Sequence, residues 1–149
     1  PYTTLFRSVH NAFIECLDDY GISAQRFGGT GRTFPFGEPF LCFQRRTSDD
    51  LVVSGYKVLG SAQRRGPAGL LQHGSLLLWA SPMAPELPGI FNLASRNIEL
   101  DSLIDGLTTK LAAACGVTWS AGELTSGEMS SASRSLGGKF SSLEWTFKR

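Results

Sequence analysis

Two residues near the middle of the chain carry side chains suited to chemistry, Lys57 and Cys42. Lys57 follows Ser54-Gly55-Tyr56, which predicts a tight turn, and it stands in an otherwise apolar strand pair. A buried lysine costs free energy unless its ammonium group meets an anion or a strong acceptor. A cysteine thiolate is a good nucleophile, and a thioester keeps an acyl group reactive. The plainer alternatives are a surface lysine on a hairpin and a cysteine that packs as a small hydrophobic residue.

Small residues follow the lysine in the same strand. Gly60, Ser61 and Ala62 permit a ligand to approach the backbone closely, or else a strand kink with tight packing. His73 and Gly74 lie in the next predicted strand, where neighbouring residues point to opposite faces of the sheet. Two alternatives stay open for His73: a hydrogen-bonded structural histidine, or a residue that lines a site.

Hydrophobic spacing predicts the elements that must position these side chains. Apolar residues from Val9 to Tyr20 recur at helical spacing, and Gly21 is a suitable helix end. Residues 23–40 predict a loop with short extended pieces. Further extended segments are predicted at residues 40–43, 51–53, 57–63 and 70–79, the last as a buried strand after a polar turn at residues 64–69. A loop with a short helix is predicted at residues 81–98, and a longer helix at residues 100–114, ended by Gly116.

The last part of the chain has its own signals. Thr125 and Glu128 fit a capping box, in which each side chain accepts a hydrogen bond from the free backbone N–H group of the other residue. A short helix to about Leu136 is predicted, ended by the glycines at 137–138, and residues 142–148 predict a last strand. The alternation of sheet and helix suggests an α/β or an α+β fold, and the hairpin favours a mixed or antiparallel sheet. We expect an α+β fold, a mixed sheet with flanking helices.

Composition narrows the function classes. Of the 149 residues, 42% are hydrophobic and 18% charged, which is typical of a globular chain and excludes disordered, collagen-like and coiled-coil proteins. The net charge of +1 gives no case for nucleic acid or an acidic membrane surface. No apolar run approaches the roughly 18–20 residues of a membrane helix. We therefore expect neither nucleic acid nor membrane as a partner.

The cysteines bear on metal sites and on compartment. The 3 cysteines form no C-x-x-C pair and no metal-like spacing with histidine, so we expect no metal site and no disulfide framework. Cys16 and Cys115 fall within helical patterns and are predicted to pack. This sparse set favours a reduced, cytoplasmic setting.

The first eight residues read PYTTLFRS. This string is similar to one reading frame of a common sequencing adapter. We interpret residues 1–8 as an adapter-derived, non-native segment; a native, frayed N-terminal segment is the alternative. On the first interpretation the native chain starts near Val9, and residues 9–149 form the C-terminal part of a single, N-terminally truncated domain.

Two motifs carry a resemblance to a known family. After the glycine turn come KVLGSAQRR at residues 57–65 and LQHGSL at residues 71–76, and residues 122–145 add a helix-and-strand pattern. This combination resembles the lipoate-protein ligase and octanoyltransferase family, which shares its catalytic fold with biotin-protein ligases. The resemblance covers most of residues 9–149 and implies a partial biotin/lipoate protein ligase-like catalytic domain.

The resemblance implies protein lipoylation, the transfer of an octanoyl or lipoyl group to a lysine of a lipoyl carrier domain. Such carriers are the E2 subunits of 2-oxoacid dehydrogenases and the glycine cleavage H protein. In the octanoyltransferase reading, octanoyl acyl carrier protein is the donor, Cys42 carries the acyl group as a thioester, and no cofactor is needed. In the ligase reading, lipoate with ATP and Mg²⁺ forms lipoyl-adenylate, Lys57 contacts the adenylate, and Cys42 is dispensable.

The residue roles follow from the same resemblance. Lys57 and Cys42 are the expected catalytic residues, and a positive group aimed at the acyl oxygen would stabilise the transition state of acyl transfer. The expected substrate-binding residues are Gly60, Ser61, Ala62, Gln63, His73 and Gly74. The family's upstream Arg-Arg and glycine-rich ligand loop is absent from this sequence. A third possibility, from another class, is a non-catalytic carrier-binding module or an inactive fragment.

Overall fold

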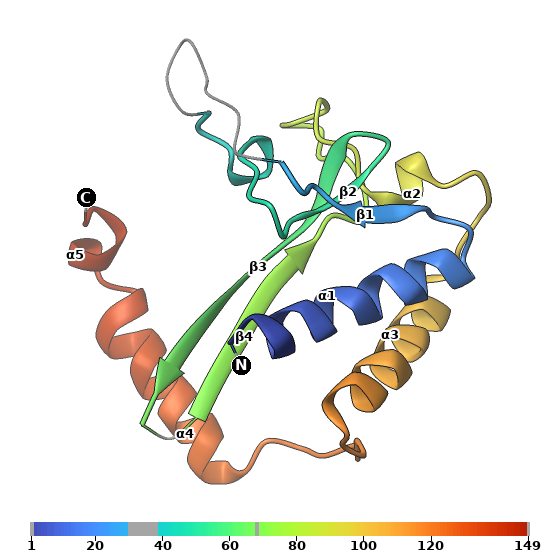
Figure 1. The fold of residues 1–149 in the computed structure, drawn as a ribbon. Coiled ribbons are helices and arrows are strands. Elements are labelled where there is room, and N and C mark those ends of the chain that lie inside the picture. Colours follow the sequence, from blue (N-terminus) through green and yellow to red (C-terminus); the bar gives the residue numbers. More distant parts are fainter. Residues whose placement is uncertain (1, 30–38, 68, 149) are drawn as a thin grey trace. The chain divides into compact units, whose positions relative to one another are not determined.

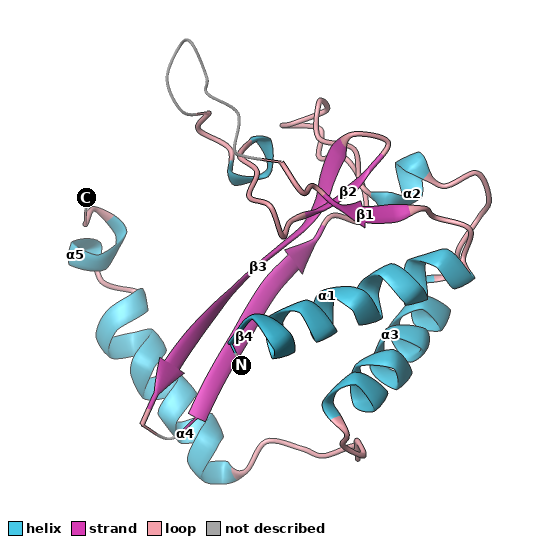
Figure 2. Cartoon of the chain, viewed as in Figure 1, coloured by secondary structure: helices cyan, strands magenta, loops and turns pink. Residues whose placement is uncertain are grey.

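The computed structural model describes residues 2–29, 39–67 and 69–148. The chain divides into two compact units, Pro1–Thr118 and Trp119–Arg149, which are described separately. The first unit holds a sheet with helices, and the second is helical (Figure 1, Figure 2). In chain order the elements of the first unit are α1 (Tyr2–Asp19), β1 (Ala24–Arg26), η1 (Cys42–Gln44), β2 (Leu51–Val53), β3 (Tyr56–Gly66), β4 (Gly69–Leu76), α2 (Ile90–Leu93) and α3 (Leu100–Cys115).

The sheet has the order β1-β2-β3-β4, and each neighbouring pair is antiparallel. The α+β class is confirmed, but the pairing among the described strands is antiparallel throughout rather than mixed. Ser54 and Gly55 both have positive φ, 49° and 82°, as a two-residue type I′ turn between β2 and β3 requires. This turn directs Lys57 back along the sheet beside β2.

The long helices pack side by side against this sheet (Figure 1). α1 ends before Gly21, whose φ is +73°, and α3 ends at Gly116, whose φ is +65°, so both predicted helix ends are confirmed. α1 begins at Tyr2 and therefore includes most of the segment that we interpret as adapter-derived; the origin of that segment stays a proposal. The short helix expected within residues 81–98 is α2.

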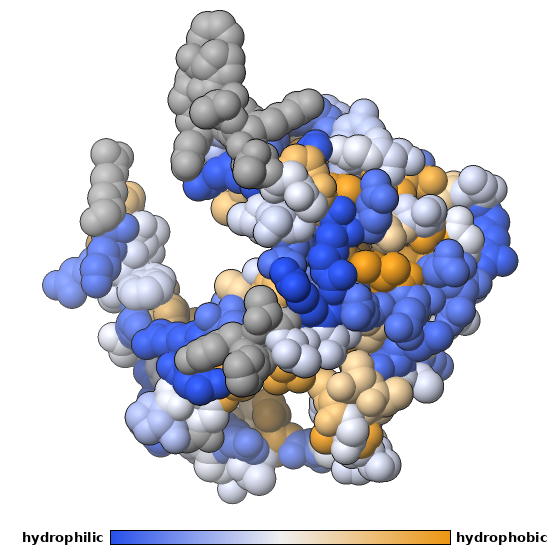
Figure 3. Space-filling view, in the orientation of Figure 1, coloured by the Kyte–Doolittle hydropathy of each residue, from blue (hydrophilic) through white to orange (hydrophobic). Residues whose placement is uncertain are grey.

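The hydrophobic core lies between these helices and the sheet. It is built from α1, β1, β2, the first half of β3, α2 and α3. Its buried members are Cys16, Leu17, Ile22, Ala24, Leu51, Val53, Val58, Leu59, Ile90, Ile98 and Leu103. Cys16 packs as predicted. Cys115, at the end of α3, is exposed, so its predicted packing is wrong. Apolar surface also appears between polar side chains on the face drawn in Figure 3.

The β3–β4 hairpin is longer than predicted and less buried. Its ladder continues to the pair Gly66↔Gly69, so the polar turn expected at residues 64–69 is mostly strand. The backbone hydrogen bonds of the ladder keep these residues extended, although their polar composition is typical of a turn. The apolar run of β4 was expected to be buried, yet most of its residues are exposed. β4 is last in the order of the described strands, and much of it pairs with a part of β3 that reaches beyond the core.

The second unit consists of α4 (Ser126–Ser135), a π-helix η2 (Leu136–Phe140) and α5 (Leu143–Thr146). The predicted capping box is confirmed: Glu128 N donates to Thr125 Oγ1 at 3.2 Å, and Thr125 N donates to Glu128 Oε2 at 2.7 Å. The glycines at 137–138 do not end the helical path, because the π-turn bridges them. The predicted last strand is wrong: Ser142 Oγ instead accepts from Trp145 N at 3.2 Å and caps α5.

Candidate active site

Lys57 forms a buried ion pair that the sequence did not predict. Its Nζ lies 2.8 Å from Asp50 Oδ2, and the two side chains are only 11% and 6% exposed. Nζ also donates to the Arg45 carbonyl at 3.1 Å. A lysine ammonium has three donors, so this geometry leaves one N–H for a ligand. Lys57 is therefore a held, buried cation, and the surface-lysine alternative is wrong.

The Asp50 carboxylate is also held by a backbone hydrogen bond, in addition to its ion pair with Lys57. The backbone N–H of Thr47 donates to Asp50 Oδ2 at 2.7 Å, in a turn that leads into β2. The available signal in the sequence was an aspartate directly before the fully apolar strand Leu51–Val53, which the hairpin folds against the strand of Lys57. A buried carboxylate in that position needs a cation.

Gly60 makes space for the lysine side chain. A Cβ added at Gly60 would lie 2.8 Å from Lys57 Cε and 3.0 Å from its Nζ. This contact fits the tight-packing alternative for Gly60, because the group that approaches the backbone is the Lys57 side chain. The approach of a ligand to this strand stays a prediction. Gly74 is equally constrained, because a Cβ there would lie 2.7 Å from the Gly60 carbonyl oxygen.

Cys42 begins a short 3-10 helix, so the extended segment expected at residues 40–43 is wrong. Its thiol is exposed, and an Arg45 guanidinium N–H donates to its Sγ at 3.9 Å. The next residue, Phe43, holds its ring 5.5 Å from Lys57 Nζ, within the range of a cation–π contact. Cys42 is thus not a packed core residue, and its helix lies beside the lysine.

A cavity of about 380 Å³ joins most of the expected site residues. Its lining includes Cys42, Lys57, Gly60, Ser61, Ala62, His73 and Gly74, and also Asp50 and Phe43. A second cavity of about 300 Å³ shares Phe43 and Lys57 and adds Arg46. Gln63 lies outside both cavities: its side-chain amide donates to Gln72 Oε1 at 2.7 Å across the hairpin.

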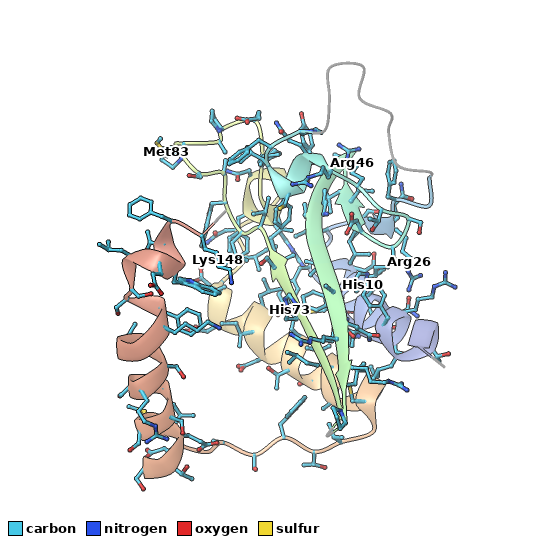
Figure 4. All side chains as sticks on the ribbon, turned by 90° about the vertical axis from the view of Figure 1, so that its left-hand side faces the viewer. His10, Arg26, Arg46, His73, Met83 and Lys148 are labelled. Carbon is cyan, nitrogen blue, oxygen red and sulfur yellow. The ribbon has the colours of Figure 1, made fainter. Side chains whose placement is uncertain are left out.

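His73 is exposed on β4 and lines the larger cavity (Figure 4). Its backbone pairs with Ala62 in the β3–β4 ladder, but its imidazole ring has no hydrogen bond to any residue that the structure describes, which argues against a hydrogen-bonded structural histidine. Within the described residues no cluster of three or more histidine, cysteine or acidic side chains could hold a metal ion. No helix among them is long and apolar enough to cross a membrane.

His10 is a second buried polar residue, after Asp50, that the sequence did not place in the site. It is fully buried, its Nδ1 lies 2.7 Å from the Asp49 carbonyl oxygen, and its Nε2 lies 2.6 Å from Ser61 Oγ. Burial lowers the pKa of His10 below its ordinary 6.5. The sequence signal was its helical spacing from Phe13 and Leu17, which places it on the core-facing side of α1.

Comparison with known proteins tests the resemblance. No protein-family model matches the chain. An octanoyltransferase LipM of Symbiobacterium thermophilum is 36% identical over 76 residues, which cover 49% of this chain and 28% of that protein. An octanoyltransferase LipM of Clostridioides difficile is 27% identical over 141 residues, 80% of this chain and 52% of that protein.

Solved structures agree in fold. The lipoate protein ligase Ta0514 of T. acidophilum, solved with bound lipoic acid, superposes with a TM-score of 0.73 at 18% identity, covering 97% of this chain and 58% of that one. In sequence the chain is similar to octanoyltransferases, and in fold it is similar to lipoate-protein ligases. A crystal structure of lipoate-protein ligase A bound with ATP gives the same TM-score and identity, with 97% of this chain and 59% of that one covered. The chain spans about half the length of the Clostridioides difficile relative and less of the Symbiobacterium one.

Proposed function

We propose that this chain is part of an octanoyltransferase that moves an octanoyl or lipoyl group to a lysine of a lipoyl carrier domain through a thioester on Cys42. The observation that carries the proposal is the shared cavity, in which the exposed thiol of Cys42 and the buried ammonium of Lys57 line one space. The sequence relationship to octanoyltransferases supports the same chemistry.

In the first step Cys42 Sγ attacks the carbonyl carbon of octanoyl acyl carrier protein. The new carbon–sulfur bond replaces the donor's thioester bond, and the donor leaves as a thiol. In the second step the amine of the acceptor lysine attacks the Cys42 thioester, an amide bond forms, and the cysteine thiol is released. Each step places negative charge on the acyl oxygen.

Lys57 is the group that stabilises this charge. Asp50 and the Arg45 carbonyl take two of its three donors and hold the ammonium in place, which leaves the third for the acyl oxygen. A donor held before the reaction needs no reorganisation in the transition state, and such a donor contributes about 10²–10³ in rate.

The alternative is a ligase that uses lipoate and Mg²⁺–ATP, with Lys57 against the adenylate. It draws support from the fold, because structural neighbours were solved with lipoic acid and with ATP. The acceptor in either case is a lipoyl carrier domain, either an E2 subunit or the glycine cleavage H protein; one neighbour is described together with an E2 lipoyl domain.

The deciding experiment uses the full-length protein that contains this chain. This protein is incubated with apo lipoyl domain and octanoyl acyl carrier protein without ATP. The intact mass of the acceptor is the readout, and an octanoyl-sized gain is expected. A gain only with lipoate and Mg²⁺–ATP would make the enzyme a ligase. Binding of the lipoyl domain without transfer under either condition would make it a carrier-binding module.

A matched pair of cysteine variants tests the thioester. Cys42→Ser is expected to abolish transfer and the acyl-enzyme mass, whereas Cys115→Ser is expected to retain both, because Cys115 is equally exposed but lies at the end of α3. Full activity in Cys42→Ser would exclude the thioester mechanism.

A further inference from the structure

His10 is a fully buried histidine that the proposed chemistry leaves unused. It lies on α1, on the helical side of the sheet (Figure 4). Its two hydrogen bonds reach residues that are 39 and 51 positions away in the sequence. One bond reaches Asp49, before β2, and the other reaches Ser61, in β3. The second partner lines the Lys57 cavity, so His10 is connected to the candidate active site through one hydroxyl group.

The partners of His10 determine where its proton lies. The Asp49 backbone carbonyl can only accept, so the 2.7 Å contact requires that Nδ1 carry the hydrogen. In the neutral ring Nε2 is then an acceptor, and the 2.6 Å contact requires the Ser61 hydroxyl to donate to it. The hydroxyl hydrogen of Ser61 is thereby directed away from the cavity and toward the histidine.

Ser61 Oγ keeps acceptor capacity on its other side. The side-chain amide of Gln72 donates to it at 3.3 Å, which uses one of its two lone pairs. Gly74 pairs with Ser61 across the hairpin and has no side chain to cover it. A second lone pair of an oriented hydroxyl is thus available in the cavity that Cys42 and Lys57 also line.

We propose that Ser61 and His10 form a proton relay that serves the attack of the acceptor amine on the acyl group. This inference rests on the proposed function. The amine nitrogen forms its bond to the carbonyl carbon and gives a proton to Ser61 Oγ, while Ser61 gives its own proton to His10 Nε2. The carbon–sulfur bond to Cys42 then breaks, and the proton returns along the same path to the released thiolate. Ser61 touches the substrate, and His10 is a positioning residue that acts through it.

The charges around His10 agree with a transient proton. Burial lowers its pKa, so the ring is neutral and able to accept near neutral pH. Asp49 and Asp50, before β2, raise the pKa again, and Arg26, in β1, lowers it. From β4, His73 lines the same small cavity beside His10. The imidazolium formed in the relay would keep its Nδ1–H bond to the Asp49 carbonyl.

NMR tests the relay geometry without any assay of transfer. The protein segment described here has 2 histidines, so His10→Gln and His73→Gln identify their signals in a long-range ¹H–¹⁵N spectrum of the gene product. We expect His10 as the Nδ1–H tautomer, with an Nε2 resonance that moves in Ser61→Ala. An Nε2–H tautomer, or an Nε2 chemical shift that is the same in Ser61→Ala as in the wild type, would overturn the proposal.

Separate measurement of the two half-reactions tests the role. With octanoyl acyl carrier protein, Ser61→Ala and His10→Gln are expected to slow the formation of acyl-Cys42 much less than they slow the later transfer. Subsequent transfer to the lipoyl domain is expected to fall about 10²-fold, the lower end for general base catalysis, so the acyl-enzyme accumulates. Ser61→Thr, which keeps the hydroxyl, is expected to recover transfer.

The controls separate the possible failures. Ser102→Ala removes an exposed hydroxyl on α3 and is expected to leave both half-reactions unchanged. Equal loss of both half-reactions in Ser61→Ala would mean a structural role and overturn the relay. A wild-type enzyme that never forms acyl-Cys42 would overturn the proposed function, and with it the step assigned to the relay.

Discussion

The β3–β4 hairpin has two halves that share one backbone ladder but differ in their surroundings. The inner half, residues 56–61 with 74–76, contains Val58 at 0% and Leu59 at 3% exposure. The outer half, residues 62–66 with 69–73, contains Leu71 at 60% exposure. Every expected site residue that lines the large cavity, apart from Cys42, lies in the inner half or at its border.

The comparison shows what turns a hairpin into a site. Backbone pairing is continuous from Leu59↔Leu76 to Gly66↔Gly69, so hydrogen bonding does not distinguish the halves. Packing against α1 and β2 distinguishes the two halves. It excludes water around Lys57 and Ser61, and it places Asp50 beside Lys57 and His10 beside Ser61. Low exposure strengthens these polar contacts.

The largest difference is expected between two of the three cationic residues of β3, Lys57 and Arg64. Lys57→Ala leaves the Asp50 carboxylate buried without its partner and should lower the free energy of unfolding by about 3–5 kcal/mol. Arg64→Ala, in the exposed outer half, should change it by no more than about 0.5 kcal/mol. Urea unfolding followed by circular dichroism measures both, and equal effects would mean that the ion pair contributes nothing to stability.

Two Leu→Ala variants compare the two halves of the hairpin again, and here the same atoms are removed at both positions. Leu59→Ala opens a hole between β3 and the core and should cost about 2–5 kcal/mol. Leu71→Ala removes a side chain that is mostly in water and should cost about 0.5 kcal/mol or less. Thermal unfolding in parallel gives the difference; a large loss for Leu71→Ala would show that the outer half is covered in the complete protein.

Two glycines give a smaller effect. Gly74→Ala pushes a Cβ to within 2.7 Å of the Gly60 carbonyl oxygen, and the overpacking should cost about 1–3 kcal/mol. Gly66→Ala meets no atom within 4 Å and should be neutral or raise stability by up to about 1 kcal/mol. Chemical denaturation distinguishes the two, and tolerance of Gly74→Ala would mean that the strands can separate there.

The smallest effect is a pH dependence. Because burial lowers the folded-state pKa of His10 below 6.5, the unfolded chain binds the proton more readily. The contribution of neutral His10 is therefore complete above about pH 6.5 and is lost as the pH falls through the lowered folded-state pKa. Unfolding free energies measured across this range should show a shallower dependence on pH in His10→Gln than in the wild type, and equal slopes would contradict the assignment.

The local features of this protein could be predicted from its sequence. Helical spacing and glycine ends gave α1 and α3, the Ser54-Gly55 turn gave the β2–β3 hairpin, and the Thr125 capping box gave the start of α4. These succeed because each depends on residues only a few positions apart. The motif around Lys57 likewise identified most of the cavity lining, since the hairpin register brings its two halves together.

The contacts between polar groups that are distant in the sequence depend on how the helices and strands pack, and local sequence patterns did not reveal them. Asp50 reaches Lys57 because β2 and β3 pair, and His10 reaches Ser61, 51 residues away, because α1 packs on the sheet. Burial of β4 could not be predicted from its apolar composition either, because exposure depends on what covers a strand. Spacing along the chain encodes a helix face or a turn, whereas the partner of a buried charge is set by how the elements pack.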